Sequence, residues 1–323
     1  MSASLRRLLP LLVLLVVGCP GRTVPAVGPL REVTVATDDW GGVEDAVRGI
    51  LQQRIATPQP EPEFRLRVFT LDQFKTYSLF RTLLMVGTTD DSVIRGVLKE
   101  RVDSLPGGNY GLFRIPNPWA DNQVLLVFAA REPGALVPGL EEYADRIREA
   151  FRSAVLDHCR RAVYHRGHNR AAEDSLRDRF AFGVDVPKSW WLRQDFADER
   201  FVYLYGHHPD RNVFVYWEEG GRELEPAEMW RLRDSLTGLF YDGDSVPDTL
   251  RSADTVEFLG GPCLRQTGIW QNEKDVLGGP VVNYAFNHEG RFFMLDGLVY
   301  NPGRPKLDGL YQVEAVMRTF TPR

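Results

Sequence analysis

The chain has 323 residues, a net charge of −5 and a hydrophobic content of 43%. This length is enough for one large or two medium domains, and this composition excludes an intrinsically disordered chain. The mild acidity disfavours binding to nucleic acid or adhesion to anionic lipid.

The first 18 residues have the layout of a cleaved export signal. Arg6 and Arg7 provide a positive region, residues 8–17 an apolar region, and Gly18 a small residue at the cleavage point. A helix needs roughly 20 apolar residues to span a bilayer, so this segment is too short for a permanent transmembrane helix. We therefore expect residues 1–18 to be removed, which changes the net charge from −5 to −7 because two arginines are lost.

Residues 16–19, Val-Val-Gly-Cys, resemble the lipobox of bacterial lipoproteins, in which the cysteine thiol is acylated and the signal is cut before it. This resemblance implies that Cys19 carries lipid, such as palmitate, and anchors the protein to a bilayer. Two or more acyl chains suffice because each buried methylene contributes about 0.8 kcal/mol. Pro20 stands where an aspartate retains such proteins in the inner membrane, so the analogy implies the periplasmic face of the outer membrane. An ordinary secretory signal with an incidental cysteine is the alternative.

Composition divides the mature chain into four parts. Residues 19–30 are rich in proline and glycine and predict an extended tether. We expect an N-terminal α/β lobe over 31–165, a polar connector over 166–186 and a C-terminal α+β lobe over 187–323.

Hydrophobic periodicity predicts the elements of the first lobe. Strands are expected at 32–40, 64–71, 80–87 and 123–130, and helices at 41–55, 90–102 and 138–165. In the second lobe we expect a hairpin over 201–217 with its turn at 208–210, a helix over 226–240, and strands at 267–273, 278–287 and 291–301. A helix over 307–320 ends the chain. The pattern predicts an α+β fold with mixed, largely antiparallel sheets and flanking helices.

The two lobes have one internal similarity. Residues 123–151 align without gaps with residues 212–240, and apolar positions such as Leu140 and Met229 coincide. A duplicated strand and helix produce this similarity, and so do two independent units with loops of equal length. The sequence therefore leaves open whether the lobes are related.

Four stretches resemble an uncharacterised lipoprotein family of Gram-negative bacteria, of Bacteroidetes type, known as the domain of unknown function DUF4837. They are PQPEPEF (58–64), NPWADNQVLLVFAA (117–130), TGIWQNEKDVLGGPVVNY (267–284) and LDGLVYNP (295–302). Together they extend over most of the mature chain. The resemblance implies lipid attachment and a shared fold, and it transfers no activity.

Cys159 and Cys263 remain once Cys19 is acylated. An even pair in an oxidising compartment permits one disulfide, and two isolated buried thiols fit the sequence equally well.

Two groups of residues suggest chemistry. Asp38 and Asp39, followed by Trp40, stand between a strand and a helix, where paired carboxylates could act as acid and base or bind a cation; one of them could instead cap the helix. The other group resembles a metal site, but it lacks a fourth ligand and arginines crowd it, so we expect no metal and no cofactor. Its members are His158, Cys159, His165 and His168.

Two further stretches suggest binding. The segment 106–123 carries Tyr110, Trp119 and Asp121, a combination used in protein or glycan recognition, although the rings could instead cover a sheet. Trp270 precedes the Gly278-Gly279 pair, which predicts either a cradle for an anion or a sheet corner that needs glycine.

The sequence contains neither a nucleophile elbow nor a dinucleotide-binding glycine pattern. We therefore expect a non-enzymatic envelope lipoprotein that binds a protein or glycan of the envelope and not nucleic acid. The alternatives are a tethered hydrolase using Asp38 or Asp39, and a solute-binding lipoprotein. A hydrolase predicts a cleft with carboxylates of shifted pKa, a binding module predicts exposed aromatic rings, and a solute binder predicts a closed pocket between the two halves.

Overall fold

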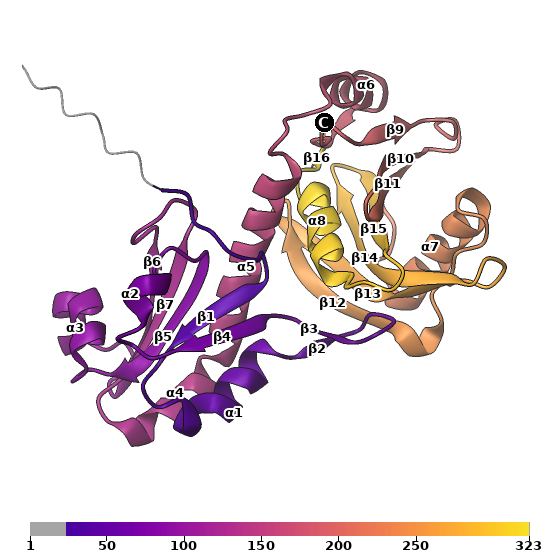
Figure 1. Ribbon diagram of the computed structural model, residues 1–323. Coiled ribbons are helices and arrows are strands. Elements are labelled where there is room, and N and C mark those ends of the chain that lie inside the picture. Colours follow the sequence, from indigo (N-terminus) through magenta and orange to yellow (C-terminus); the bar gives the residue numbers. More distant parts are fainter. Residues whose placement is uncertain (1–23, 323) are drawn as a thin grey trace, which may run out of the picture.

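The computed structural model describes residues 24–322, and the predicted export signal and Cys19 lie outside the described residues. The described chain forms two lobes that pack side by side (Figure 1). The predicted α+β class with mixed and antiparallel sheets is confirmed. Among residues 24–322, no helix combines the length and the apolar character that crossing a membrane requires.

The N-terminal lobe is built on a five-stranded sheet. Four of its strands are parallel, and the edge strand β6 runs antiparallel to β7. Strands β5 and β7 are apolar almost throughout, as expected for parallel strands covered on both faces. From edge to edge the strands are β4 (Arg65–Phe69), β1 (Glu32–Ala36), β5 (Thr82–Thr88), β7 (Val124–Ala130) and β6 (Tyr110–Pro116).

Helices cover both faces of this sheet. Alternate residues of β5 pack to opposite sides, with Leu84 in one hydrophobic cluster and Met85 in the other. One face is covered by α1 (Trp40–Leu51), α4 (Leu136–Glu142) and α5 (Ala144–Val163). The other is covered by α2 (Phe74–Tyr77), α3 (Ser92–Leu98) and the 3-10 helix η1 (Lys99–Asp103).

The C-terminal lobe is built on a seven-stranded antiparallel sheet. Helix α7 (Pro226–Phe240) packs on one face and α8 (Leu307–Met317) on the other. The strand order is β12 (Arg251–Phe258), β13 (Gly261–Asn272), β14 (Leu277–His288), β15 (Arg291–Tyr300), β11 (Asp210–Glu219), β10 (Phe201–Gly206) and β9 (Trp191–Arg193).

Short elements complete the fold. They are the hairpin β2 (Arg54–Ile55) and β3 (Glu61–Pro62), the pair β8 (Phe182–Gly183) and β16 (Thr321–Pro322), helix α6 (Arg170–Phe180), and the 3-10 turns η2 (Pro133–Ala135) and η3 (Asp248–Leu250).

The structure refines three sequence predictions. The helix expected over 138–165 is two helices, α4 and α5, because the chain turns at Tyr143, whose ring packs against Tyr110 and Phe128. The connector 166–186 contains α6 and β8 and is therefore structured. The end of the predicted tether runs along the N-terminal lobe, since the Ala26 N–H donates to the Asp121 carbonyl at 3.0 Å.

The similar segments 123–151 and 212–240 lie in different sheets, the first starting with the parallel strand β7 and the second with the antiparallel β11.

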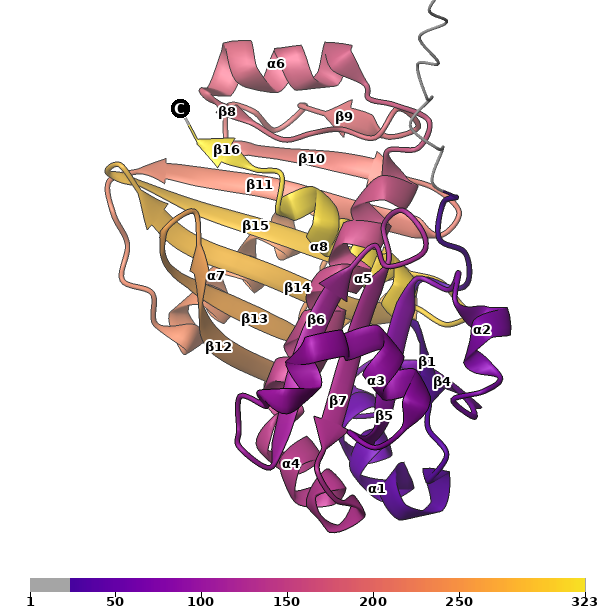
Figure 2. The same cartoon turned by 90° about the vertical axis from the view of Figure 1, so that its left-hand side faces the viewer.

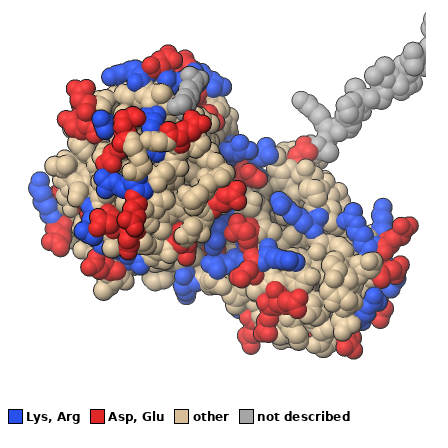
Figure 3. All heavy atoms as spheres, turned by 180° about the vertical axis from the view of Figure 1, so that it is seen from behind, with Lys and Arg blue, Asp and Glu red and all other residues tan. Residues whose placement is uncertain are grey.

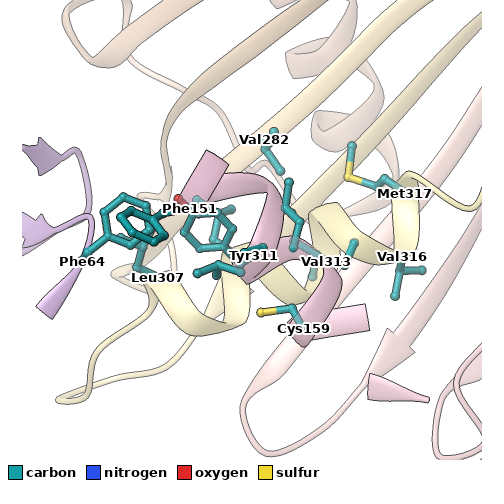
Figure 4. Packing of buried hydrophobic residues seen from close by; sticks show 14 of the residues in the cluster. Phe64, Phe151, Cys159, Val282, Leu307, Tyr311, Val313, Val316 and Met317 are labelled. Atoms are coloured by element: carbon teal, nitrogen blue, oxygen red, sulfur yellow. The ribbon is translucent and has the colours of Figure 1, made fainter. Parts of the chain in front are cut away.

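One hydrophobic core extends through both lobes. Helix α8 lies between the C-terminal sheet and α5, an arrangement that Figure 2 shows from the side. Phe151 and Cys159 of α5 meet Tyr311 and Val313 of α8 in this core, and Phe64 packs edge to face on Phe151 with ring centroids 6.3 Å apart (Figure 4). Because burial of this apolar surface would be lost if the lobes separated, the core holds them together as one body.

Charged side chains reinforce this contact between the lobes. The fully buried carboxylate of Glu63 accepts hydrogen bonds from Arg148 Nε at 2.6 Å, Arg152 Nε at 2.9 Å and the hydroxyl of Tyr311 on α8 at 2.8 Å. Glu61 accepts from the backbone N–H of Lys306 at 2.6 Å and so caps the start of α8. The N-terminal lobe therefore fixes both the position and the first turn of a C-terminal helix.

Candidate functional site

A groove lies at one end of the seven-stranded sheet, where the β10–β11 turn, the β13–β14 turn and the end of β15 meet. The strand register places Trp191 opposite Tyr205, Tyr205 opposite Asn212, and Asn212 opposite Leu298. Residues directly opposite one another on antiparallel strands share a face of the sheet, so these four form one row. That face is the one covered by α7, and the chain after α7 forms the opposite wall.

This aromatic groove has a volume of about 460 Å³. A second cavity of about 630 Å³ shares the lining residues Asp210 and Tyr300 with it, so the two cavities adjoin. Trp191 is 53% exposed and lies beside it, with its ring centroid 6.1 Å from that of Tyr205. The rings and carboxylates that line the groove are Tyr203, Tyr205, Phe240, Tyr241, Trp270 and Tyr300, and Asp210, Asp242, Asp244 and Asp275.

The groove carries excess negative charge. Four aspartates and one arginine line it, and that arginine, Arg193, donates from Nε to Asp195 at 2.9 Å. Burial raises the pKa of Asp244, against the opposing effect of a hydrogen bond from Asn272 Nδ2 at 3.0 Å. Asn272 also donates to the Asp242 carbonyl at 3.2 Å, so it ties the β13–β14 turn to the wall after α7.

Two other cavities have balanced charges. The cavity between the lobes, about 280 Å³, is lined by three arginines and three carboxylates, and the cavity beside α6, about 570 Å³, is lined by three of each. Figure 3 likewise shows acidic and basic side chains interspersed over the face seen from behind. Of these three cavities, the aromatic groove combines uncompensated charge with aromatic walls, which makes it the candidate binding site.

Both aspartates singled out in the sequence analysis bond backbone N–H groups, and Asp39 caps a helix. Asp39 is the N-cap of α1 and accepts from the Gly42 N–H at 3.1 Å, while Asp38 accepts from the Leu71 N–H at 2.9 Å. Trp40 begins α1 and lies beneath the Arg48 guanidinium, 5.5 Å from the ring centroid. The capping interpretation explains both residue type and position.

The aromatic segment 106–123 mostly covers the N-terminal sheet. Tyr110 begins β6 and packs against Phe128 and Tyr143, so it belongs to the core. Trp119 is 38% exposed but leans on Phe74, with centroids 5.3 Å apart. The backbone of Asp121 forms hydrogen bonds with residues 24–26 and so fixes this segment on the lobe. These residues lie in the other lobe from the aromatic groove.

Trp270 lines the groove, whereas Gly278 and Gly279 form part of strand β14 beside it. A Cβ atom at Gly279 would lie 1.9 Å from the backbone oxygen of Val299 on the neighbouring strand β15. The glycine therefore permits a close approach of two strands, as the sheet-corner interpretation expects.

Replacing Gly279 by alanine is expected to lower the free energy of unfolding by about 1–3 kcal/mol, because the backbone of β15 must move away. Urea unfolding checks this. Gly238→Ala is the control, since a Cβ there meets nothing within 4 Å and the site is inside helix α7. If Gly279→Ala unfolds at the same urea concentration as the parent, the close approach does not require glycine.

The histidine group does not converge. His158 Nε2 bonds the Asn122 carbonyl at 2.8 Å and His165 Nδ1 bonds the Ala162 carbonyl at 2.7 Å, so each uses a ring nitrogen to hold a backbone carbonyl. His168 instead pairs with Glu173, and these two with Asp185 bring three possible metal ligands within 4.8 Å.

Glu173 is already saturated with hydrogen bonds. It accepts from His168 Nδ1 at 2.7 Å, from the Val186 N–H at 2.9 Å and from Arg170 Nη1 at 2.6 Å. Burial raises its pKa, but these three donors outweigh burial and lower it. The Arg170 guanidinium already pairs with this carboxylate and disfavours a metal cation beside it. We therefore infer that Glu173 and His168 stabilise the start of α6.

Cys159 and Cys263 are free, buried thiols, which answers the question left open by the sequence. Burial raises the pKa of each thiol to about 12. Both therefore remain protonated and unreactive at neutral pH.

Sequence reasoning missed most of the groove. Tyr203 and Tyr205 alternate along a strand that was expected, and this two-residue period was the available signal for a shared face. The Asp-Gly-Asp stretch 242–244 follows a helix whose end was predicted correctly. Their meeting with Tyr300 depends on the order of strands in the sheet, which periodicity does not encode.

Comparison with known proteins divides the chain where the lobes divide. Residues 26–164 match the domain of unknown function DUF8532 and residues 169–319 match the domain of unknown function DUF4837. The resemblance to DUF4837 is thus confirmed for the second lobe, but the stretches 58–64 and 117–130 lie in the part that matches DUF8532. No curated protein matches the chain.

Solved structures give partial likenesses. A Bacteroides thetaiotaomicron VPI-5482 protein is 15% identical with a TM-score of 0.29, and the match covers 44% of this chain and 45% of that one. The cyanobacterial PsbP protein CyanoP of Synechocystis sp. PCC 6803 is 11% identical with a TM-score of 0.32, over 44% of this chain and 87% of that one. The match thus spans less than half of the first protein's length. The N-terminal lobe is thus similar to DUF8532 and the C-terminal lobe to DUF4837, and each match covers less than half of the chain.

Proposed function

We propose that this protein is a lipoprotein of the cell envelope, anchored through acylated Cys19 at the periplasmic face of the outer membrane, that binds an envelope partner in the aromatic groove without catalysing a reaction. The observation that carries the proposal is the groove itself: its half-buried rings, the exposed Trp191 beside them and the exposed carboxylates of Asp242 and Asp275 lie at the loop end of the seven-stranded sheet. The lipobox supports the anchor.

The rigid contact between the lobes argues against solute capture by closure. A clamshell needs a hinge, whereas here α5, α8 and the Glu63 cluster join the lobes through a continuous core. The cavity between the lobes is also occupied by charges that already pair with one another.

A hydrolase acting in the same groove is the second candidate. Asp244 is 7% exposed with a raised pKa, as a general acid requires, and Asp242 and Asp275 stand nearby in the groove as possible bases. The hydrolase predicts that Asp244→Asn abolishes release of soluble fragments from isolated envelopes while leaving partner binding intact. The binding proposal predicts that the unmodified protein releases no such fragments.

In-cell crosslinking followed by mass spectrometry tests the binding proposal. We expect one envelope molecule to be recovered with the parent protein and to be lost with the double variant Trp191→Ala and Tyr205→Ala. Trp119→Ala, which removes an exposed ring from the other lobe, should retain it. If the groove variant recovers the same partner, the groove is not the binding site.

The anchor has its own test. Cys19→Ser protein should take up no labelled palmitate and leave the membrane fraction. Persistent labelling or membrane retention of this variant would contradict the lipobox interpretation.

A further inference from the structure

We infer that the ligand of the aromatic groove is a cationic segment of its partner, an extended peptide carrying lysine or arginine side chains; this inference rests on the proposed binding function. Four aspartates line the groove. Asp210 among them pairs with His207 at 2.8 Å, and the single arginine of the groove is already paired with Asp195. Among residues 24–322, Asp242 and Asp275 form no ion pair and are both exposed. A positively charged ligand would supply the missing counterions.

The rings of the groove also lack cations. Elsewhere in this protein arginines lie over aromatic faces, for example Arg211 over Trp190 at 5.4 Å and Arg251 over Trp230 at 5.5 Å. Within the described residues, no such cation lies over the aromatic side chains of the groove. Rings beside carboxylates are the surroundings in which an ammonium or guanidinium group binds best.

The spacing of the carboxylates favours a segment over a single ion. No three carboxylates of the groove bring their oxygens within 4.8 Å of one another, so the site is not arranged around one metal ion. The groove of about 460 Å³ adjoins a cavity of about 630 Å³ at Asp210 and Tyr300, and the two together offer room for several residues of a chain. His207 and Arg304 line only the second cavity, so the negative charge is concentrated at the Tyr203 end.

Fluorescence anisotropy with the full-length protein in detergent micelles tests this inference. The probes are labelled octalysine, octaarginine, octaglutamate and an uncharged Gly-Ser octapeptide, with labelled chitotetraose as a neutral glycan. We expect the two cationic peptides to bind and the other probes not to. The double variant Asp242→Asn and Asp275→Asn should weaken cationic binding about tenfold or more.

The control is the double variant Asp90→Asn and Glu149→Gln, which also removes two negative charges but does so away from the groove. These side chains are 87% and 65% exposed. This variant should bind the cationic peptides as the parent does. Equal weakening by both double variants would show non-specific attraction and overturn the inference, as would preferential binding of octaglutamate or chitotetraose, or no binding of any peptide.

The two proposals fail separately. If crosslinking still recovers a partner that depends on Trp191 and Tyr205 while no cationic peptide binds, the binding function stands and the cationic ligand is wrong. If partner recovery is independent of the groove, the proposed function is wrong whatever the peptides do.

Discussion

Replacing Glu63 by glutamine is expected to lower the free energy of unfolding by about 3 kcal/mol. The Glu63 side chain is completely buried and contacts Arg148 at 2.6 Å, Arg152 at 2.7 Å and the Tyr311 hydroxyl at 2.8 Å. Glutamine keeps the shape but leaves two guanidinium groups without their counterion. These guanidinium groups are 23% and 29% exposed, so water relieves part of the cost. The expected loss of stability is therefore at the lower end of the range for broken buried ion pairs.

Acid should weaken the parent protein through the same residue. Burial raises the pKa of Glu63, but the charges of Arg152 and Arg148 outweigh burial and hold the pKa below its ordinary value of 4.5. A carboxyl whose folded pKa is lowered stabilises the fold above its unfolded pKa, and this stabilisation is lost as the pH falls through the folded value. The urea midpoint should therefore fall on acidification below about pH 4.5, and it should fall less steeply in Glu63→Gln.

Glu149→Gln is the matched control. It makes the same chemical change beside the same arginine, Arg152, but Glu149 lies on the surface of α5, is 65% exposed and is 3.5 Å from that arginine. Its effect should stay within about 0.5 kcal/mol, as for most exposed ion pairs. Equal destabilisation by the two variants would show that the Glu63 cluster does not hold the lobes together.

Local patterns predicted the elements better than their arrangement. The alternation in 201–217 and the helical spacing in 226–240 correspond closely to β10, β11 and α7. Strand β12 was missed because its exposed edge position leaves it few apolar residues. The parallel order of β4, β1, β5 and β7 depends on contacts between distant segments, so no window of sequence contained it.

The site was predictable only where one residue carried the signal. Trp270 was singled out as an aromatic residue before the Gly278-Gly279 pair, and it does line the groove. Asp38 and Asp39 attracted attention as a pair, but an aspartate before a helix is explained first by capping, which the structure shows for Asp39. Glu63 gave no local signal, since its partners lie about 85 to 250 residues away along the chain.

Replacing Arg233 by methionine is expected to cost about 3–5 kcal/mol at pH 7. Arg233 on α7 and Asp296 on β15 are both 0% exposed in their side chains, with Nε and Oδ2 3.2 Å apart. Burial raises the pKa of Asp296 even though Arg233 opposes the shift. Methionine fills similar space but leaves this carboxyl with an uncompensated charge beneath the sheet. Urea unfolding of both proteins measures the difference.

The pH dependence identifies the cause. Without Arg233 the folded pKa of Asp296 rises further, so the cost of its buried charge grows as the pH rises above the ordinary value of 3.8 and vanishes below it. The deficit of Arg233→Met should therefore shrink as the pH is lowered from 7 towards 4. Arg231→Met on the same helix, 67% exposed and paired with Glu228, should cost no more than about 0.5 kcal/mol at either pH.

Removing both charges should restore most of the lost stability. In the double variant Arg233→Met and Asp296→Asn no buried charge remains, and replacing a buried ion pair by uncharged groups is often neutral. If the double variant is as unstable as Arg233→Met, packing of the arginine stem rather than its charge accounts for the loss. The ion pair also anchors α7, and the chain that follows α7 supplies Tyr241, Asp242 and Asp244 to the groove. A stable double variant that no longer binds the partner would therefore show that Arg233 and Asp296 position this wall of the groove.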